Sequence, residues 1–235
     1  MTSDDRSTIW KAIWEKKGAD RNASILFADG FEGLLTLAEM DLMIQKVTSP
    51  LELNGTESIM DCGCGAGAFL DGLLKVHPGL KVSGLDYSAT LLERARERFN
   101  GDFFVADLSE LGFLPAASYD RTISFSAFQY LSSEAIARRA VEGMLRITKP
   151  GGMVYIGDVP DVAKLELANS IRKISHQAIK KVSALNPDHL FYPKELFLDI
   201  SRENGTKIRI IDQTEFDLGN YQGARYRYSV YMTKK

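Results

Sequence analysis

The chain has 235 residues, of which 45% are hydrophobic and 26% charged, and its formal net charge is −2. This length and composition fit one α/β domain, or one domain with an appendage, and a sizeable core. No apolar stretch of about 18 residues and no secretory signal occurs, so we expect a cytoplasmic protein that does not enter a membrane. The basic residues are scattered, which argues against a nucleic-acid partner.

The first 50 residues read as two helices. Gly18 ends the first one, and a second helix is predicted over Gly33–Val47, before Pro50. Trp10 and Trp14 lie four residues apart on one side of the first helix, as in a segment that folds back over an apolar surface. We therefore expect residues 1–50 to form an N-terminal helical cap on a core of residues 51–235.

From residue 58 onward, short apolar runs alternate with helical patterns. Strands are predicted at Ser58–Cys62, Lys81–Asp86, Phe103–Ala106, Tyr119–Ser124 and Met153–Asp158. Helices are predicted at Ala68–Val76, Ala89–Phe99 and Glu134–Ile147. Strands that alternate with helices at this spacing form βαβ units, so the sequence predicts a parallel sheet with helices on both faces.

The last third of the chain departs from this alternation. Residues 159–192 are expected to form an inserted helical lid, with an amphipathic helix over Val162–Ala184, and a further helix is predicted at Pro193–Glu203. Two strand-like runs, Lys207–Phe216 and Ala224–Thr233, predict an antiparallel pair at the sheet edge. The fold class that results is α/β, with a Rossmann-like, seven-stranded, mostly parallel sheet.

A glycine-rich segment, Asp61-Cys-Gly-Cys-Gly-Ala-Gly67, joins the first strand to the following helix. Glycines at such a junction allow a sharp turn and a close approach of a ligand to the backbone. The start of the next helix offers free N–H groups to an anionic ligand group. The segment is therefore predicted to bind a ligand at the carboxyl ends of the strands.

The two cysteines of this segment pose an alternative, because thiols also bind metals. Cys62 and Cys64 are the only cysteines, and they are separated by one residue, whereas metal sites usually pair Cys-x-x-Cys motifs. His77, His176 and His189 are too dispersed to complete a ligand set. We expect no metal, and interpret both thiols as small apolar filling.

Two further acids follow the second and third strands. Asp86 comes about 20 residues after the glycines, where it could accept hydrogen bonds from a ribose diol. Alternatively, Asp86 or Ser88 caps the next helix. Asp107 could accept a hydrogen bond from an exocyclic amine of a base, or it is simply a loop acid.

These segments together carry a resemblance. The residues 61–67, 84–88, 106–108, 119–131 and 145–152 resemble, in order and spacing, the motifs of class I methyltransferases that use S-adenosylmethionine. The likeness runs from Ser58 to Asp158. A nicotinamide-binding site would prefer Gly-x-Gly-x-x-Gly, from which Gly63, Gly65 and Gly67 depart.

The resemblance implies a role for each matching position. Asp61 would contact the amino group of the methionine moiety, Asp86 the ribose hydroxyls, and Asp107 the adenine amine. The other implied cofactor-binding residues are Gly63, Cys64, Gly65, Gly67, Tyr87 against the adenine, Leu108, Ser124 through its backbone, Phe125 and Gln129.

The acceptor is less clearly marked. Candidate catalytic residues are Tyr130, Asp158 and His176, with His189 as a further one; the alternatives are a core phenol, a turn acid and surface imidazoles. Relatives that methylate amide or base nitrogens of protein or nucleic acid often carry an Asn-Pro-Pro-Tyr signature after the fourth strand. This sequence lacks it, which favours a small-molecule acceptor such as a sugar, a lipid-linked intermediate or a secondary metabolite. An oxygen acceptor is favoured over nitrogen. The rival functions are a nucleotide-dependent oxidoreductase and an inactive methyltransferase-like binding subunit.

Overall fold

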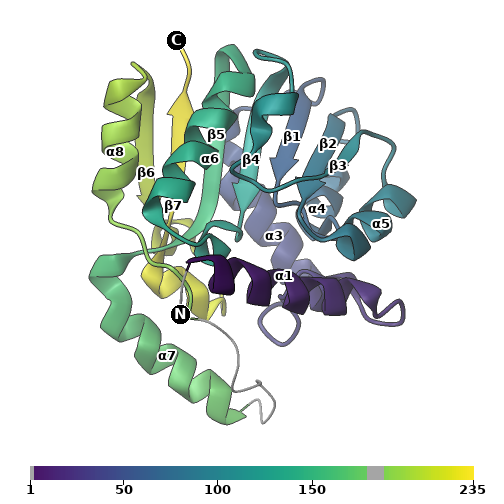
Figure 1. Ribbon diagram of the computed structural model, residues 1–235. Coiled ribbons are helices and arrows are strands. Elements are labelled where there is room, and N and C mark those ends of the chain that lie inside the picture. Colours follow the sequence, from purple (N-terminus) through teal and green to yellow (C-terminus); the bar gives the residue numbers. More distant parts are fainter. Residues whose placement is uncertain (1–2, 179–187) are drawn as a thin grey trace.

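A seven-stranded sheet with the order β3-β2-β1-β4-β5-β7-β6 forms the centre of the molecule (Figure 1). The structure is a computed structural model that describes residues 3–178 and 188–235, with side chains for 6–172 and 188–235. The first five strands are parallel, and β7 is antiparallel to both β5 and β6, which confirms the predicted sheet. The strands are β1 (Ser58–Cys62), β2 (Lys81–Asp86), β3 (Phe103–Val105), β4 (Tyr119–Phe125), β5 (Thr148–Pro160), β6 (Lys207–Asp212) and β7 (Arg227–Thr233).

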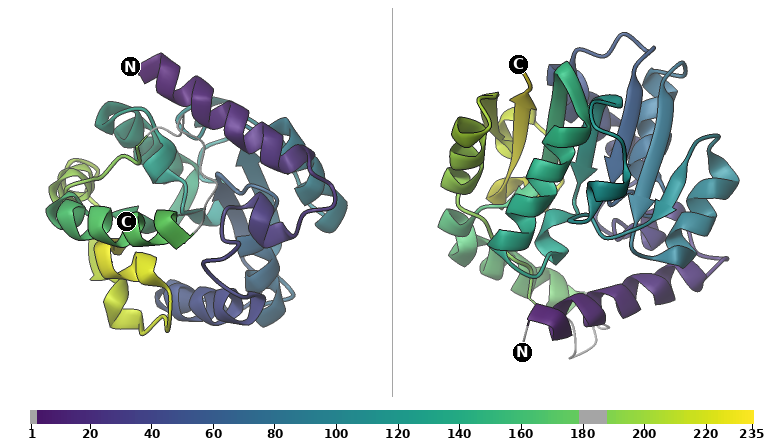
Figure 2. Two further views of the ribbon diagram at one scale, coloured as in Figure 1. Left: turned by 90° about the horizontal axis from the view of Figure 1, so that it is seen from below. Right: turned by 45° about the horizontal axis from the view of Figure 1, so that its top comes forward.

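Helices cover both faces of the sheet (Figures 1 and 2). On one face lie α3 (Leu37–Thr48), α4 (Ala68–Val76) and α5 (Ala89–Arg98); on the other lie α6 (Glu134–Ile147) and α8 (Lys194–Glu203). Successive side chains of a strand point to opposite faces. Accordingly, Ile59 of β1 packs in the core beneath α3 and α4, and Met60 packs in the core beneath α6.

Two helices lie at the end of the sheet where the parallel strands finish. These are α1 (Ser3–Ala19) and α7 (Leu165–Ala178), and Figure 2 shows α1 running across that end of the molecule. The buried side of α1 carries Trp10, Trp14 and Gly18, spaced four residues apart. A short helix, α2 (Ile25–Ala28), then leads towards α3. No helix in the described part of the chain has both the length and the apolar character needed to cross a membrane.

Several boundaries differ from the predicted ones, and local capping explains the clearest case. The helix predicted from Gly33 starts at Leu37, because Thr36 and Glu39 form a capping box: Oγ1 of Thr36 accepts from the amide of Glu39, and Oε2 of Glu39 accepts from the amide of Thr36. The predicted Val162–Ala184 helix is a 3₁₀ turn, Val162–Lys164, followed by α7; residues 179–187 lie outside the described part.

The two C-terminal strands are shorter than predicted. The strand predicted over Lys207–Phe216 ends at Asp212, where Asp212 and Glu215 form a capping box that turns the chain into a 3₁₀ helix. The run predicted as strand from Ala224 begins with a 3₁₀ helix, and β7 starts at Arg227. Apolar residues in short 3₁₀ turns are difficult to distinguish by pattern from strand residues.

Candidate functional site

A pocket lies where β1, β2, β3 and β4 end, and α1 and the loop after α2 form its outer wall. This is the position at which open parallel sheets bind their ligands. The core contributes Asp61, Gly63, Cys64, Gly65, Asp86, Tyr87, Asp107, Leu108, Phe125 and Tyr130 to the lining, among others; the N-terminal segment contributes Ser7, Trp14, Asp29 and Phe31.

The glycine-rich loop makes a tight turn that only glycine accommodates easily. Gly63, Gly65 and Gly67 all have positive φ, at 85°, 56° and 91°. The loop is held to the end of β2, because the amides of Gly63 and Cys64 both donate to the carbonyl of Leu85, at 2.8 and 2.9 Å. The turn therefore sets the backbone of the loop against the pocket.

Asp61 is a buried carboxylate without a partner. It is 1% exposed, and neither of its carboxylate oxygens has a hydrogen-bond partner among the described residues. Burial, together with the charges of Asp29 and Asp86, raises its pKa well above the ordinary value. An unpartnered buried acid is costly, and a ligand ammonium in the pocket would satisfy it.

Asp86 connects the end of β2 to the glycine-rich loop. One of its carboxylate oxygens accepts from the amide of Gly65 and the other from the amide of Ser88, both at 2.9 Å. Burial raises its pKa to about 7, despite these two hydrogen bonds. Ser88, and not Asp86, caps α5, since its hydroxyl accepts from the amide of Leu91. A carboxylate has about four lone-pair sites, so Asp86 keeps capacity for ligand hydroxyls.

The third acid lies in the loop after β3. Asp107 is partly exposed, and its Oδ1 accepts from the amide and the hydroxyl of Ser109, at 2.8 and 2.6 Å. The amide of Ala106 donates to the carbonyl of Asp86, which keeps the two loops adjacent. The sequence thus predicted acids at three neighbouring strand ends, and the structure places all three at one pocket.

Four of the other predicted residues do not line the pocket, and neither does His189. Gly67 starts α4 and lies against the ring of Phe99, and Ser124 is fully buried in β4. Gln129 is buried, and its amide donates to the carbonyl and the hydroxyl of Ser126, both at 2.8 Å. Asp158, the fourth, is engaged elsewhere.

The carboxylate of Asp158 belongs to a buried cluster at the end of β5. It forms an ion pair with Arg227 and accepts a hydrogen bond from the hydroxyl of Tyr221, at 2.9 Å. The cluster lies outside the pocket lining. His176 is in α7, but its side chain is outside the described part of the chain.

Tyr130, the remaining predicted catalytic residue, lines the pocket beneath α1. Its ring lies 4.6 Å from that of Trp10, 5.1 Å from that of Trp14 and 5.2 Å from that of His189, measured between ring centres. All three pairs are edge-to-face, the geometry that aromatic rings favour. Burial raises the pKa of the Tyr130 phenol, so its hydroxyl stays protonated near neutral pH.

No pattern in the sequence predicted Asp29 as a site residue, although its carboxylate lies at the pocket. Oδ1 accepts from the amide of Ala66 at 2.6 Å, and Oδ2 from the amide of Ala68 at 2.7 Å. These amides lie at the start of α4, where a carboxylate is favourable. In the sequence, an Asp-Gly pair in a short loop is typical of a simple turn.

Neither thiol has the surroundings of a reactive or metal-binding cysteine. Cys62 and Cys64 are both buried, and burial raises the pKa of each thiol. Among the residues that the structure describes, no three His, Cys, Asp or Glu side chains lie close enough together to hold a metal ion.

Comparisons with known proteins agree with this arrangement. Residues 59–152 match the family model "Methyltransferase domain". The chain is 33% identical over 121 residues to the malonyl-[acyl-carrier protein] O-methyltransferase of Erwinia pyrifoliae, which is 51% of this chain and 44% of the relative. It is 28% identical over 127 residues to the trans-aconitate 2-methyltransferase of Paracidovorax citrulli, 54% of this chain and 47% of the relative. The chain thus spans about half the length of these curated relatives.

The fold is shared with solved structures as well. The putative methyltransferase in complex with the Trm112 methyltransferase activator of Haloferax volcanii superposes with a TM-score of 0.65 at 20% identity, over 94% of this chain and 98% of that chain. The residues that match the family model include the glycine-rich loop, Asp61 near the end of β1 and Asp86 at the end of β2. Residues 59–152 therefore form a methyltransferase domain, and the chain shares its fold with solved methyltransferases.

Proposed function

We propose that the chain transfers a methyl group from S-adenosylmethionine to a small-molecule acceptor. The observation that carries this proposal is the unpartnered carboxylate of Asp61 inside a pocket that Asp86 and Asp107 also line. The residues fit the cofactor: Asp61 suits its ammonium, Asp86 its ribose hydroxyls, and Asp107 with the amide of Leu108 its adenine. When bound, the cofactor supplies an electrophilic methyl group on a sulfonium.

The N-terminal helix supports a closed, dry reaction site. Trp10 and Trp14 are 5% and 7% exposed, and they pack on Tyr130 at the wall of the pocket. Excluding water favours a direct displacement, which depends on alignment of the two reactants. We propose that residues 1–50 act as a cap through α1 and α2, while α3 covers a face of the sheet. We further propose that residues 159–192 act as a lid that shapes the acceptor site.

The oxygen acceptor that we favour is one that loses no proton on methylation. None of the described residues that line it is a histidine or a lysine, and the Tyr130 phenol is held protonated. A carboxylate acceptor needs no base, because it loses no proton on methylation. The two curated relatives support this choice: one is named as an O-methyltransferase, and the other for trans-aconitate, a carboxylic acid. Sugars, lipid-linked intermediates and secondary metabolites remain acceptor classes to test, and the net charge of −2 favours them over nucleic acid.

Calorimetry tests the cofactor first. We expect S-adenosylmethionine and S-adenosylhomocysteine to bind, and NAD to show no heat. Binding of NAD alone would favour an oxidoreductase. Failure of S-adenosylhomocysteine to bind would contradict the proposal, whatever the result with the other ligands. If the cofactor binds, a methyl-donor assay follows, with panels of carboxylic acids, hydroxylated compounds, amines and tRNA. Transfer to none of them would favour an inactive binding subunit, and transfer to tRNA alone would overturn the small-molecule assignment.

A further inference from the structure

Asp29 reaches the pocket from a part of the chain that the methyltransferase domain match does not include. It follows α2, 37 positions before Ala66, whose amide it accepts from. A Cβ atom on Gly65 would lie 2.4 Å from Oδ1 of Asp29, so the glycine at this position leaves room for the carboxylate. The carboxylate of Asp29 thus lies directly against the glycine-rich loop.

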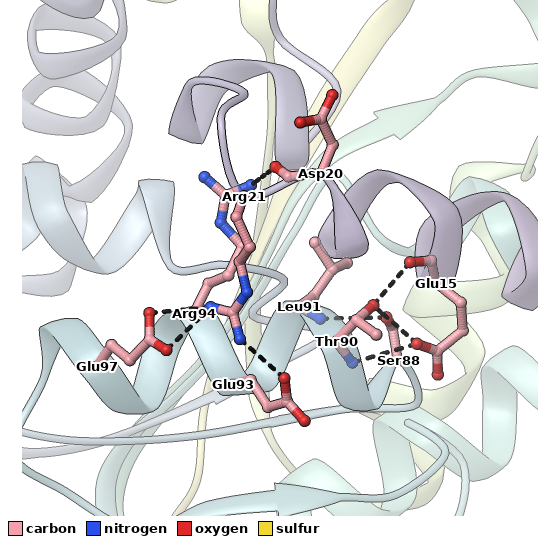
Figure 3. Close-up of polar contacts among 9 residues, drawn as sticks. All are labelled: Glu15, Asp20, Arg21, Ser88, Thr90, Leu91, Glu93, Arg94 and Glu97. Atoms are coloured by element: carbon pink, nitrogen blue, oxygen red, sulfur yellow. Dashed lines mark hydrogen bonds and ion pairs between the residues drawn. The ribbon is translucent and has the colours of Figure 1, made fainter.

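Polar contacts hold α1 and the residues that follow it to α5 (Figure 3). The carboxylate of Glu15 accepts from the amides of Ala89 and Thr90, at 2.9 and 3.1 Å, and Thr90 donates its hydroxyl to Glu15. Arg94 donates to the carbonyls of Asp20 and Ala23, at 3.0 and 2.7 Å. These contacts hold the segment before Asp29 to the helix that follows Asp86.

The carboxylates of Asp29, Asp61 and Asp86 interact with one another. Burial and the charges of Asp29 and Asp86 raise the pKa of Asp61, and burial raises the pKa of Asp29 to about 6. The cations that face Asp29 are Arg94 and Lys17, and each only partly opposes this effect. Lys17 places its ammonium 4.5 Å from the centre of the Trp14 ring. Three acids thus lie together at this part of the pocket, where a bound cation would favour their ionised forms.

We propose that Asp29 is a cofactor-binding residue that, together with Asp61, holds the ammonium of the amino-acid part of S-adenosylmethionine. The N-terminal segment then supplies part of the cofactor site as well as covering it. Each oxygen of Asp29 uses one lone pair, on the amide of Ala66 or of Ala68, so each can accept a further hydrogen bond. This inference rests on the proposed function, because it takes the cofactor from there.

A purely structural role is the alternative, in which Asp29 only caps α4. Two ligands separate the roles. S-adenosylhomocysteine contains the ammonium, whereas 5′-methylthioadenosine has the adenine, the ribose and the sulfur but lacks the amino-acid part. Loss of a cap would distort the glycine-rich loop and weaken the binding of both ligands. Loss of an ammonium contact would weaken the binding of S-adenosylhomocysteine only.

The experiment measures the affinity of both ligands for the full chain by calorimetry. For Asp29→Asn we expect S-adenosylhomocysteine to bind about tenfold more weakly or worse, the usual effect of losing a charged hydrogen bond, and 5′-methylthioadenosine to bind within about twofold of the unaltered protein. Asp20→Asn, in the same segment but exposed, should change neither affinity. Asp29→Ser keeps a capping oxygen without the charge and replaces the asparagine variant if that variant does not fold.

Equal weakening of both ligands, or of neither, would overturn the role of Asp29 and leave the proposed function standing. If the unaltered protein binds neither ligand, the proposed function itself fails. A second readout uses the unaltered protein between about pH 5.5 and 7, where the ligand ammonium stays protonated. The affinity for S-adenosylhomocysteine should rise with pH more steeply than that for 5′-methylthioadenosine, and Asp29→Asn should reduce the difference.

Discussion

The guanidinium of Arg227 is buried against the carboxylate of Asp158, and this pair joins the end of β5 to the start of β7. Tyr221 donates its hydroxyl to the same carboxylate. Asp158 has a φ of 63°, unusual for a residue other than glycine, so the ion pair forms where the backbone leaves the regular strand. The cluster fixes β5 and β7 to each other.

Replacing Arg227 by methionine should destabilise the protein strongly. The substitution leaves the buried charge of Asp158 without its partner, which typically costs about 3–5 kcal/mol of the free energy of unfolding. Urea denaturation measures this change. Arg225→Met removes an exposed arginine two positions away and should cost less than about 0.5 kcal/mol. Similar values for the two variants would show that the pair does not stabilise the fold.

Replacing Gly18 by alanine should loosen α1. Alanine normally stabilises a helix by up to about 1 kcal/mol relative to glycine. Here, however, the new Cβ would lie 2.6 Å from the backbone nitrogen of Leu91 and 2.4 Å from the hydroxyl oxygen of Thr90. We expect faster hydrogen exchange in residues 3–19 and weaker binding of S-adenosylhomocysteine. Gly112→Ala, which meets open space, is the matched control and should change neither. Unchanged exchange in α1 would contradict the close approach.

The contact of Glu15 with the start of α5 should depend on pH and be lost in acid. Burial opposes ionisation, but hydrogen bonds from Thr90 and Ala89 outweigh it and lower the pKa of Glu15 below 4.5. A lowered pKa means that the stabilisation is complete above the unfolded value and is lost as pH falls through the folded one. Brief exposure to a series of acidic pH values followed by pulsed hydrogen exchange should therefore show α1 detaching as the pH falls below the ordinary range of a glutamate. Glu15→Gln should show this looser state at neutral pH, and an exposed control in α7, Glu166→Gln, should not.

Asp86 should matter for every ligand that contains ribose. Asp86→Ala is expected to weaken the binding of S-adenosylhomocysteine and of 5′-methylthioadenosine alike, by about tenfold or more. This pattern contrasts with the one expected for Asp29, and selective loss of only one ligand would contradict the assignment to ribose. Calorimetry on the same samples measures both.

The raised pKa of Asp86 also predicts how the free protein responds to pH. Because the value rises from 3.8 to about 7, the folded state holds this proton more tightly than the unfolded state does. Its contribution to the free energy of unfolding is complete below about pH 4 and is lost as pH rises through about 7. Thermal melts between pH 5 and 8 should show a smaller decline for Asp86→Asn than for the unaltered protein. An identical decline would show that another group is responsible.

Much of the core was predictable because its patterns are local. The bounds of β1, β2, α4 and α6 follow from runs of apolar residues between clear turn and capping signals, and the structure has them at the predicted residues. The location of Asp61 and Asp86 at the pocket was predictable as well. A strand end next to a glycine-rich loop places a residue at the ligand-binding edge of a parallel sheet.

What the sequence did not show depends on contacts between distant residues. Asp158 ends its strand as a candidate base should, but Arg227, 69 positions later, engages it outside the pocket. Asp29 lies in a short loop without periodicity, and only the fold of α1 and α2 brings it to Ala66. Neither pairing has a pattern that a single sequence could display.

The placement of Trp10 and Trp14 gives the protein an intrinsic reporter. They are the only two tryptophans of the chain, both lie on α1, and both pack against Tyr130. Their emission therefore comes from one place, the contact between the helix and the pocket wall. Ligand entry and movement of α1 can thus be followed by fluorescence in unlabelled protein, without signal from the rest of the fold.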